Sequence, residues 1–448
     1  MTVADESLQN NRPELLNLAG RVIETANRHG ATSAECLLNQ GQGLSVTVRL
    51  GEVETVQHHR DKGLQVTVYF DQRSGSASTS DFSETAVNET VSAACSIARY
   101  TAEDQFSGLA DVGLLATSFP DLDLYHPWAM DTETAIELGQ RCEHAARSHD
   151  GRITNSEGAT CHTGEGIKIY ANSHGFCQAS IGSRHGISCS LIAETDGQMQ
   201  RDYWYDSKRR ADELPTPEMI GEIAAERTLS RLGARRLSTR QCPVIFEAPI
   251  ASGLIAHFVG AIRGSSLYRG ASFLVDSLGQ QIFATGIRIY EQPHLPRGHG
   301  SCNFDAEGVV TRERDLVKSG IVQGYVLDSY SGRKLGMPTT ANAGGVHNLT
   351  LEPGKLGREQ LIQEMGNGLL LTELIGHGIN GVTGDYSRGG VGFWIENGKI
   401  QYPVEEITVA GNLKQMYRQF RAVGNDVDER GNTRCGSILV DGMTIAGD

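Results

Sequence analysis

The sequence has few prolines, no patterned cysteines and no long apolar run. Only 12 of its 448 residues are proline, and its nine cysteines are scattered singly, without a C-x-x-C pair. Such a set argues against a disulfide framework and favours a reducing compartment. No apolar stretch approaches the roughly 20 residues that a membrane span needs, and the N-terminus MTVADESLQNNRPELL has no apolar core like that of a signal peptide. We therefore expect a cytoplasmic protein that does not associate with membranes.

Positive charge is also scarce. The chain carries 40 Lys and Arg against 54 Asp and Glu, which gives a formal net charge of −14. A field of this sign repels phosphate backbones. The basic run SKRR, residues 207–210, is followed at once by Asp212 and Glu213, which is typical of a solvated surface. We therefore expect no nucleic-acid partner.

Glycine, in contrast, is abundant, with 53 copies. Together with the few prolines, it indicates many turns between strands. A length of 448 residues predicts two or three domains at about 150 residues each. Residues 1–235 show apolar spacings of both helical and strand period. The predicted helices cover residues 13–29, 81–100, 131–148 and 217–231. The predicted strands cover residues 34–39, 44–50, 53–58 and 64–70, then 167–172, 176–181, 187–194 and 198–205.

The first four of these strands are expected to form an antiparallel meander. Its predicted turns lie at Gly41–Gly43, at Gly51 and at Asp61–Gly63. Ser80 or Asp81 is the expected cap of the helix that follows.

The second half opens with a short strand at 244–246 and one helix, and then becomes strongly β with glycine-rich connections. We predict an α+β fold with a domain boundary near residue 235. The N-terminal domain, 1–235, would combine helices with an antiparallel sheet. The C-terminal domain, 236–448, would be β-rich with one inserted helix.

That inserted helix contains GLIAHFVGAI, residues 253–262, and raises the question of a metal site. A metalloprotease helix needs His-Glu and then a second His about one turn later; the two imidazoles hold zinc, and the Glu acts on the bound water. Here His257 is followed by Phe258, and the next turn offers only Ala261 and Ile262. From the residues alone, His257 is either a packing histidine or a single remaining ligand.

Other motifs give no complete catalytic set. There is no G-x-S-x-G nucleophile elbow, and GHGSC, residues 298–302, is typical of a plain turn. The segment TGDYSRGG, residues 383–390, places Asp385, Ser387 and Arg388 in what looks like a glycine-bounded loop. These three residues are candidates for substrate binding, with a purely structural Asp–Arg turn as the alternative.

Several long segments resemble one family. They are GSSLYRGASFLVDSLGQQI (264–282), FDAEGVVTRERDLVKSGIVQGYVLDSYSGRKLG (304–336), TGDYSRGGVGFWIENGKIQYPVEEITVAGNLKQM (383–416) and VGNDVDERGNTRCGSILVDGMTIAG (423–447). An N-terminal segment, DKGLQVTVYFDQRSGSASTSDFSE (61–84), belongs with them. All resemble the PmbA/TldD family, also called the modulator of DNA gyrase family, and within it the PmbA (TldE) branch. The resemblance runs over nearly the whole chain.

The resemblance implies a role in proteolysis. The family pairs two related subunits, TldD and PmbA, in a cytoplasmic, zinc-dependent bacterial peptidase linked to microcin maturation and to degradation of a small unfolded antitoxin. In the TldD branch, His-Glu-x-x-x-His on the helix and a Cys near the C-terminus form the zinc site. These motif positions correspond here to His257, Phe258 and Ile262, and the Cys corresponds to Cys435. The first His and the Cys are retained, whereas the base and the second His are replaced.

We therefore expect no catalytic residue and no metal site in this chain, with zinc held by a TldD-like partner subunit. The chain would complete and gate the peptidase, admit an extended peptide, and form a homodimer when the partner is missing. The main alternative is an autonomous peptidase or hydrolase that uses His257, Cys435 and residues of the glycine-rich loop. A homodimeric scaffold without proteolytic function is a further alternative.

Overall fold

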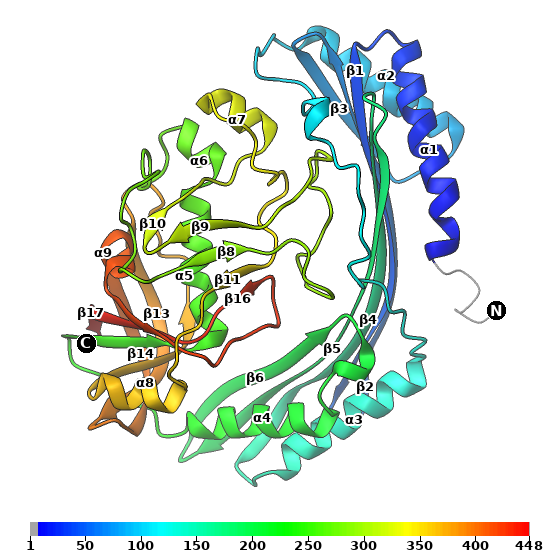
Figure 1. The fold of residues 1–448 in the computed structure, drawn as a ribbon. Helices are drawn as coiled ribbons and strands as arrows, with labels where there is room; N and C mark the ends of the chain where they lie inside the picture. The colour runs from blue at the N-terminus through cyan, green and yellow to red at the C-terminus, as the bar shows by residue number, and fades with distance from the viewer. Residues whose placement is uncertain (1–7, 448) are drawn as a thin grey trace.

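A long, curved antiparallel sheet dominates the N-terminal half of the computed structural model, which describes residues 8–447. Its strand order is β3-β2-β1-β4-β5-β6. The strands are β1 (Ser33–Arg49), β2 (Glu52–Phe70), β3 (Arg73–Thr79), β4 (Ile153–Asn172), β5 (Cys177–Thr195) and β6 (Gln198–Lys208). Figure 1 shows this sheet curving around the C-terminal half of the chain.

The four short strands predicted for residues 34–70 are in fact two long ones, so this prediction was wrong. Gly41 and Gly43 lie inside β1 and pair with Asp61 and His59 of β2. A Cβ atom at Gly43 would come within 2.4 Å of the His59 ring, so glycine is needed here for close packing rather than for a turn. Of the three predicted turns, the one at Gly51 is confirmed: Leu50 and Gly51 both have positive φ, as tight hairpins require.

Four helices cover the convex face of the sheet (Figure 1). They are α1 (Leu8–Arg28), α2 (Glu84–Tyr100), α3 (Thr132–Ser148) and α4 (Pro217–Ser230). Helices α1 and α2 bury apolar residues over one end of the strands, and α3 and α4 do so over the other end. The cap of α2 is Ser83 rather than Ser80 or Asp81, because the Ser83 hydroxyl accepts the Ala86 N–H, while the Asp81 carboxylate accepts the Ser83 N–H.

The C-terminal half contains two sheets around one large core. The first has the order β14-β13-β12-β7-β17-β15 and is closed by pairing of β14 with β17; the second has the order β10-β9-β8-β11-β16. The first sheet contains β7 (Arg240–Phe246), β12 (Gly368–Ile375), β13 (Asp385–Glu396), β14 (Lys399–Asn412), β15 (Phe420–Val423) and β17 (Ile438–Ala446). The second contains β8 (Ile289–Glu291), β9 (Arg314–Lys318), β10 (Ile321–Val322), β11 (Leu349–Leu351) and β16 (Thr433–Arg434).

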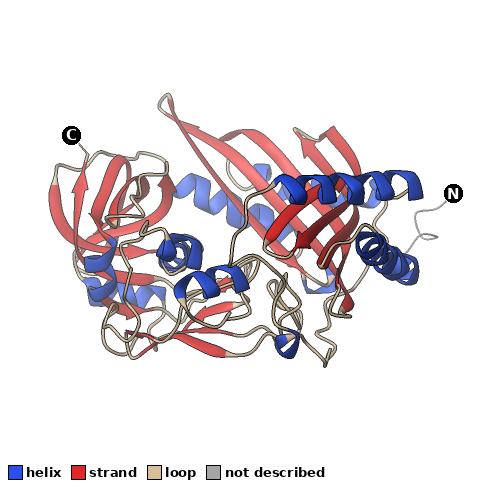
Figure 2. Ribbon diagram, turned by 90° about the horizontal axis from the view of Figure 1, so that it is seen from above, coloured by secondary structure: helices blue, strands red, loops and turns tan. Residues whose placement is uncertain are grey.

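Helix α5 (Ala248–Ala261) is the predicted inserted helix, and it packs into this core. Four shorter helices accompany it: α6 (Gly264–Tyr268), α7 (Ser329–Leu335), α8 (Arg358–Met365) and α9 (Leu413–Arg418). The predicted α+β class is therefore confirmed, and Figure 2 shows helices and sheets in both halves. No helix among residues 8–447 is long and apolar enough to cross a membrane.

The segment 385–390 is part of strand β13 and not a loop, so this prediction was also wrong. Its glycines lie against the neighbouring strand β12: a Cβ atom at Gly390 would come within 2.7 Å of the Leu371 side chain, and just beyond the segment a Cβ atom at Gly392 would come within 2.0 Å of the Leu370 carbonyl oxygen. The pairing of β13 with β14 also shifts register between Gly390 and Gly392. The glycines allow close strand contact and a bulge.

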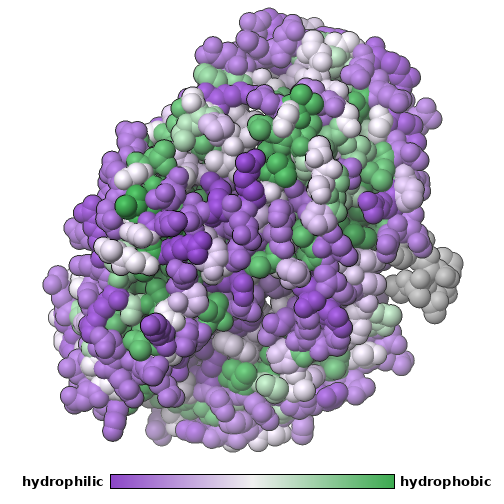
Figure 3. All heavy atoms as spheres, viewed as in Figure 1, coloured by the Kyte–Doolittle hydropathy of each residue, from purple (hydrophilic) through white to green (hydrophobic). Residues whose placement is uncertain are grey.

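One contact between the two halves lies along the free edge of β6. Two side chains of the C-terminal half donate hydrogen bonds to backbone carbonyls of this edge strand, Arg430 Nη1 to Tyr205 (3.0 Å) and His299 Nε2 to Ser207 (3.2 Å), and Arg231 of the N-terminal half donates to the Arg201 carbonyl. Such capping protects an edge that could otherwise pair with another strand. The outer surface is largely hydrophilic on the face shown in Figure 3, with smaller apolar areas between.

Candidate functional site

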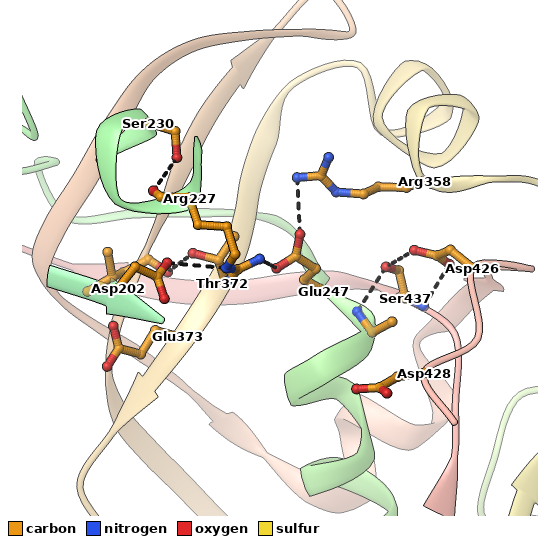
Figure 4. Close-up of polar contacts among 12 residues, drawn as sticks. Asp202, Arg227, Ser230, Glu247, Arg358, Thr372, Glu373, Asp426, Asp428 and Ser437 are labelled. Carbon is orange, nitrogen blue, oxygen red and sulfur yellow. Dashed lines mark hydrogen bonds and ion pairs between the residues drawn. The ribbon is translucent and has the colours of Figure 1, made fainter. Parts of the chain in front are cut away.

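The start of α5 is fixed by a polar network that joins both halves of the chain. Glu247, the residue before the helix, forms ion pairs with Arg227 of α4 (3.2 Å) and Arg358 of α8 (3.1 Å). The Ala248 N–H donates to Ser437 Oγ at 3.1 Å, and this hydroxyl donates to the Asp426 carboxylate at 2.6 Å. Figure 4 shows this chain of contacts. An acid is also favourable at a helix N-terminus.

His257 lies on the face of α5 that is turned toward β13. Its imidazole packs edge-on against the Tyr386 ring, with 6.1 Å between ring centroids. Burial, and the nearby positive charge of Arg388, lower the pKa of His257, so its imidazole is neutral at pH 7. Burial also raises the pKa of Tyr386 to about 12, so its hydroxyl stays protonated.

Phe258 and Ile262 belong to the core. Both side chains are fully buried, and the Phe258 ring meets the Phe283 ring edge-on at 4.9 Å between centroids. Neither side chain carries an atom that can bind a metal. The helix itself ends at Ala261, so Ile262 already lies at its C-cap.

Cys435 follows β16, which lies against α5, and its side chain is fully buried in the same core as Phe258. Its thiol contacts the Gly436 carbonyl at 3.2 Å. Burial raises the pKa of this thiol well above its usual range, and the carboxylates of Asp426 and Asp428 raise it further. A thiol must lose its proton to bind zinc, so this environment opposes metal binding.

These residues do not fit a catalytic zinc ion. Such a site uses three protein ligands and an open position, whereas His257 and Cys435 supply two donors, one of them a buried neutral thiol. Within residues 8–447, no three His, Cys, Asp or Glu side chains gather closely enough to hold a metal ion.

The three candidate residues of the segment 383–390 are not brought together. Asp385 is exposed and bonded to Thr383 and Asn412, and Ser387 is exposed as well. Arg388, in contrast, faces α5, as does Tyr386 two residues earlier. This split follows from the alternation of side chains along a strand.

Arg388 lines a cavity of about 300 Å³ between the two halves. One side is formed by β6 and α4, and the other by the first turns of α5 and by β12 and β13. The lining residues that carry charge or an aromatic ring are Asp202, Tyr203, Trp204, Tyr205, Arg227, Glu373, Arg388 and Arg430. Apart from Arg388, these residues were missed in the sequence. The one local signal was the aromatic run DYWYD, residues 202–206, near the end of a predicted strand.

Cys302 and His347 form a second pair that was not predicted. Cys302 Sγ lies 3.1 Å from His347 Nδ1, and His347 Nε2 donates to the Ala341 carbonyl at 2.9 Å. His347 Nδ1 is therefore the acceptor of the thiol proton. Burial, together with Asp305 and Glu291, raises the pKa of Cys302 to about 12, so the thiol keeps its proton and is not an activated nucleophile.

Comparisons with known proteins all indicate the same family. Models of PmbA/TldA metallopeptidases match the chain in three segments: domain 1 over residues 34–98, the central domain over 125–232 and the C-terminal domain over 239–447. The chain is 50% identical over 414 residues to Metalloprotease PmbA of Escherichia coli O157:H7, which covers 92% of each protein. It is also 23% identical to a Metalloprotease TldD homolog of Haemophilus influenzae, across 66% of each protein.

Solved structures show the same architecture. A crystal structure from Bacteroides thetaiotaomicron, provisionally described as a modulator of DNA gyrase, superposes with a TM-score of 0.91 at 28% sequence identity. The match covers 96% of this chain and 98% of the other.

Proposed function

Because the chain belongs to the PmbA/TldD metallopeptidase family, we propose that it is the PmbA-type subunit of a zinc-dependent peptidase whose metal is held by a TldD-like partner. In this proposal the chain contributes no catalytic residue. It completes and gates the chamber in which the partner cleaves peptide bonds.

The proposal rests on the residues that α5 has at the family's zinc-binding positions. At the helix positions where the TldD branch has its Glu and second His, the chain has Phe258 and Ile262, both fully buried. The remaining two positions hold a neutral His257 and a buried, protonated Cys435. Without a Glu, the proton transfer that general bases contribute, about 10²–10⁴-fold in rate, would also be missing.

The family resemblance suggests the substrates. We propose small, unfolded peptides in extended form, as in microcin-type maturation and antitoxin degradation. Nine free cysteines support a reducing, cytoplasmic location. In the absence of the partner, we propose a homodimer.

The alternative of an autonomous peptidase has less support. It would need His257 and Cys435 to act together, yet the Cys435 thiol is fully buried and its raised pKa opposes the thiolate. His257 instead faces Tyr386 and Arg388.

The test is reconstitution with a TldD-like partner. Each chain alone and the mixture are assayed for hydrolysis of an unfolded peptide, and zinc is measured in each purified chain after dialysis. We expect hydrolysis by the mixture and no stoichiometric zinc in this chain. The variant His257→Gln in this chain should leave the activity of the mixture unchanged, because His257 holds no metal in this proposal.

Two outcomes would overturn the proposal. One is hydrolysis by this chain alone, together with about one zinc ion per chain. The other is a mixture that neither co-purifies nor cleaves more peptide than the partner alone.

A further inference from the structure

The cavity between β6, α4, α5 and β13 has the size of a small binding site. Its volume of about 300 Å³ is at the lower end of the range for ligand sites and suits one amino-acid residue. Trp204, Pro249 and Ile250 give it an apolar wall, and arginines from three parts of the chain reach it.

Most charges around the cavity are already paired. Asp202 pairs with Arg227 and Arg231 (3.4 Å each), and Glu373 also pairs with Arg231. Glu247 pairs with Arg227 and Arg358, and Asp428 pairs with Arg430 at 2.7 Å. Of the charged residues that line the cavity itself, three are arginines and two are acids, which leaves one positive charge in excess.

Arg388 is the arginine at this cavity that has no carboxylate partner in the described part of the chain. It forms no ion pair among residues 8–447, and its guanidinium donates one hydrogen bond, from Nη2 to the Leu374 carbonyl at 3.3 Å. Its Nε is buried without an acceptor, as are the Nε atoms of Arg227 and Arg231 beside it. The buried hydroxyl of Tyr386, two residues away on the same face of β13, interacts with the Arg388 side chain. Unsatisfied buried polar groups are rare in folded proteins and call for an explanation.

We propose that this cavity binds a carboxylate group of a peptide, with the Arg388 guanidinium as its anchor. The proposal rests on the proposed function in peptide processing. A guanidinium binds a carboxylate through two parallel hydrogen bonds, and such charge-assisted bonds are stronger than neutral ones. The apolar wall would receive the aliphatic part of the same residue.

The charge balance selects a carboxylate over a phosphate. One excess positive charge matches a carboxylate, which carries a single negative charge. A phosphate monoester carries about −1.5 to −2 at pH 7 and would bring extra negative charge close to Asp202 and Glu373. The carboxylate could be a peptide C-terminus or the side chain of Asp or Glu, and the experiment separates the two.

The experiment measures binding of short peptides to the full chain by calorimetry at millimolar concentration. N-acetyl-tetraalanine with a free C-terminus is compared with its C-terminal amide. Two further amides carry one Glu or one Gln in place of an alanine. Preference for the free acid over its amide indicates a C-terminal carboxylate, and preference for Glu over Gln indicates a side chain.

Three variants identify the anchor. Arg388→Met removes the charge and keeps the aliphatic length, and it should weaken binding of the preferred peptide roughly tenfold or more. Arg388→Lys keeps the charge and should retain part of the preference. Arg312→Met, at an exposed arginine that does not line the cavity, should behave like the parent.

Several results would overturn the proposal. They are equal binding of all acid and amide pairs, no binding of any peptide, or a preference that survives Arg388→Met. Failure of the proposed function is recognisable separately. An Arg388-dependent preference with no hydrolysis by the reconstituted mixture would leave the carboxylate site in place and remove the peptidase function. Hydrolysis by the mixture without such a preference would support the peptidase function and remove the carboxylate site.

Discussion

Glu307 lies in the loop between β8 and β9, at the contact between the two halves. Its carboxylate accepts the Ser329 N–H at 3.0 Å. Burial raises the pKa of Glu307 to about 7, with further increases from the acids Asp305 and Asp328. Across the contact, Tyr69 and Tyr170 both donate to Glu35, and Glu307 helps to raise the pKa of both phenols.

This residue should give the protein a pH-dependent stability. Its folded-state pKa exceeds the ordinary value of 4.5, so the folded state keeps the proton to higher pH than the unfolded state. The free energy of unfolding therefore falls as pH rises from about 4.5 to about 7. We expect Glu307→Gln to remove this slope and to stabilise the protein at pH 8 by about 1–3 kcal/mol, with little effect at pH 4.

Urea unfolding of parent and variant at both pH values measures this effect. Glu313→Gln, at an exposed carboxylate of the same loop, is the matched control and should change neither value. Parallel pH profiles for parent and Glu307→Gln would show that Glu307 does not titrate in this range.

At the scale of elements, helix α5 allows a test of whether restoring the family's zinc-binding residues would create a metal site. The double change Phe258→Glu and Ile262→His would place a base and a second imidazole at the family positions. Both side chains are fully buried, and loss of a buried Phe alone costs about 3–5 kcal/mol. A buried, unpaired Glu adds to this cost.

We therefore expect a large fall in melting temperature that zinc does not reverse, because His257 packs against Tyr386 beside the positive charge of Arg388, which opposes a metal cation. Thermal melting with and without zinc measures this, and Ala256→Glu, at an exposed position of α5, is the control. A zinc-induced rise that disappears when Cys435→Ala is added would contradict the prediction. It would show that the four positions can still converge on one metal.

The sequence predicted α5 well and the strands less well, for physical reasons. Pro249 suits the first turn of a helix, and Leu254, Ile255, Phe258 and Ile262 follow at helical spacing, so the signals for this helix are local ones. Glycine is ambiguous, since Gly43 serves close packing inside a strand while Gly51 serves a turn. Local patterns do not separate these two uses.

The cavity could be predicted only in part. Arg388 was a candidate, but Asp385 and Ser387 beside it alternate away from α5. Arg227 and Arg430 reach the same cavity from positions about 200 residues apart. Such convergence depends on the tertiary fold and leaves no local spacing to read.

For the whole molecule, the prediction concerns self-association. Related subunits that pair with each other often share one mode of contact, so the chain without its partner should form a two-fold dimer through its C-terminal half. A stable contact of this kind buries about 1,200–2,000 Å² in total. Light scattering at micromolar concentration measures the mass, and addition of the TldD-like partner should replace the homodimer. A monomer at that concentration would contradict the prediction and weaken the gating role.

The capped edge of β6 has a consequence for biosynthesis. Translation delivers the whole curved sheet first, and His299 and Arg430, which cover the Ser207 and Tyr205 carbonyls, follow only later. Arg430 leaves the ribosome 222 residues after Lys208, the last residue of β6 (430 minus 208). During that interval the edge of β6 at Tyr205 and Ser207 lacks its cover, and neighbouring nascent chains can pair with it. The sheet is thus safe from such pairing only once the second half has been made and has folded against it.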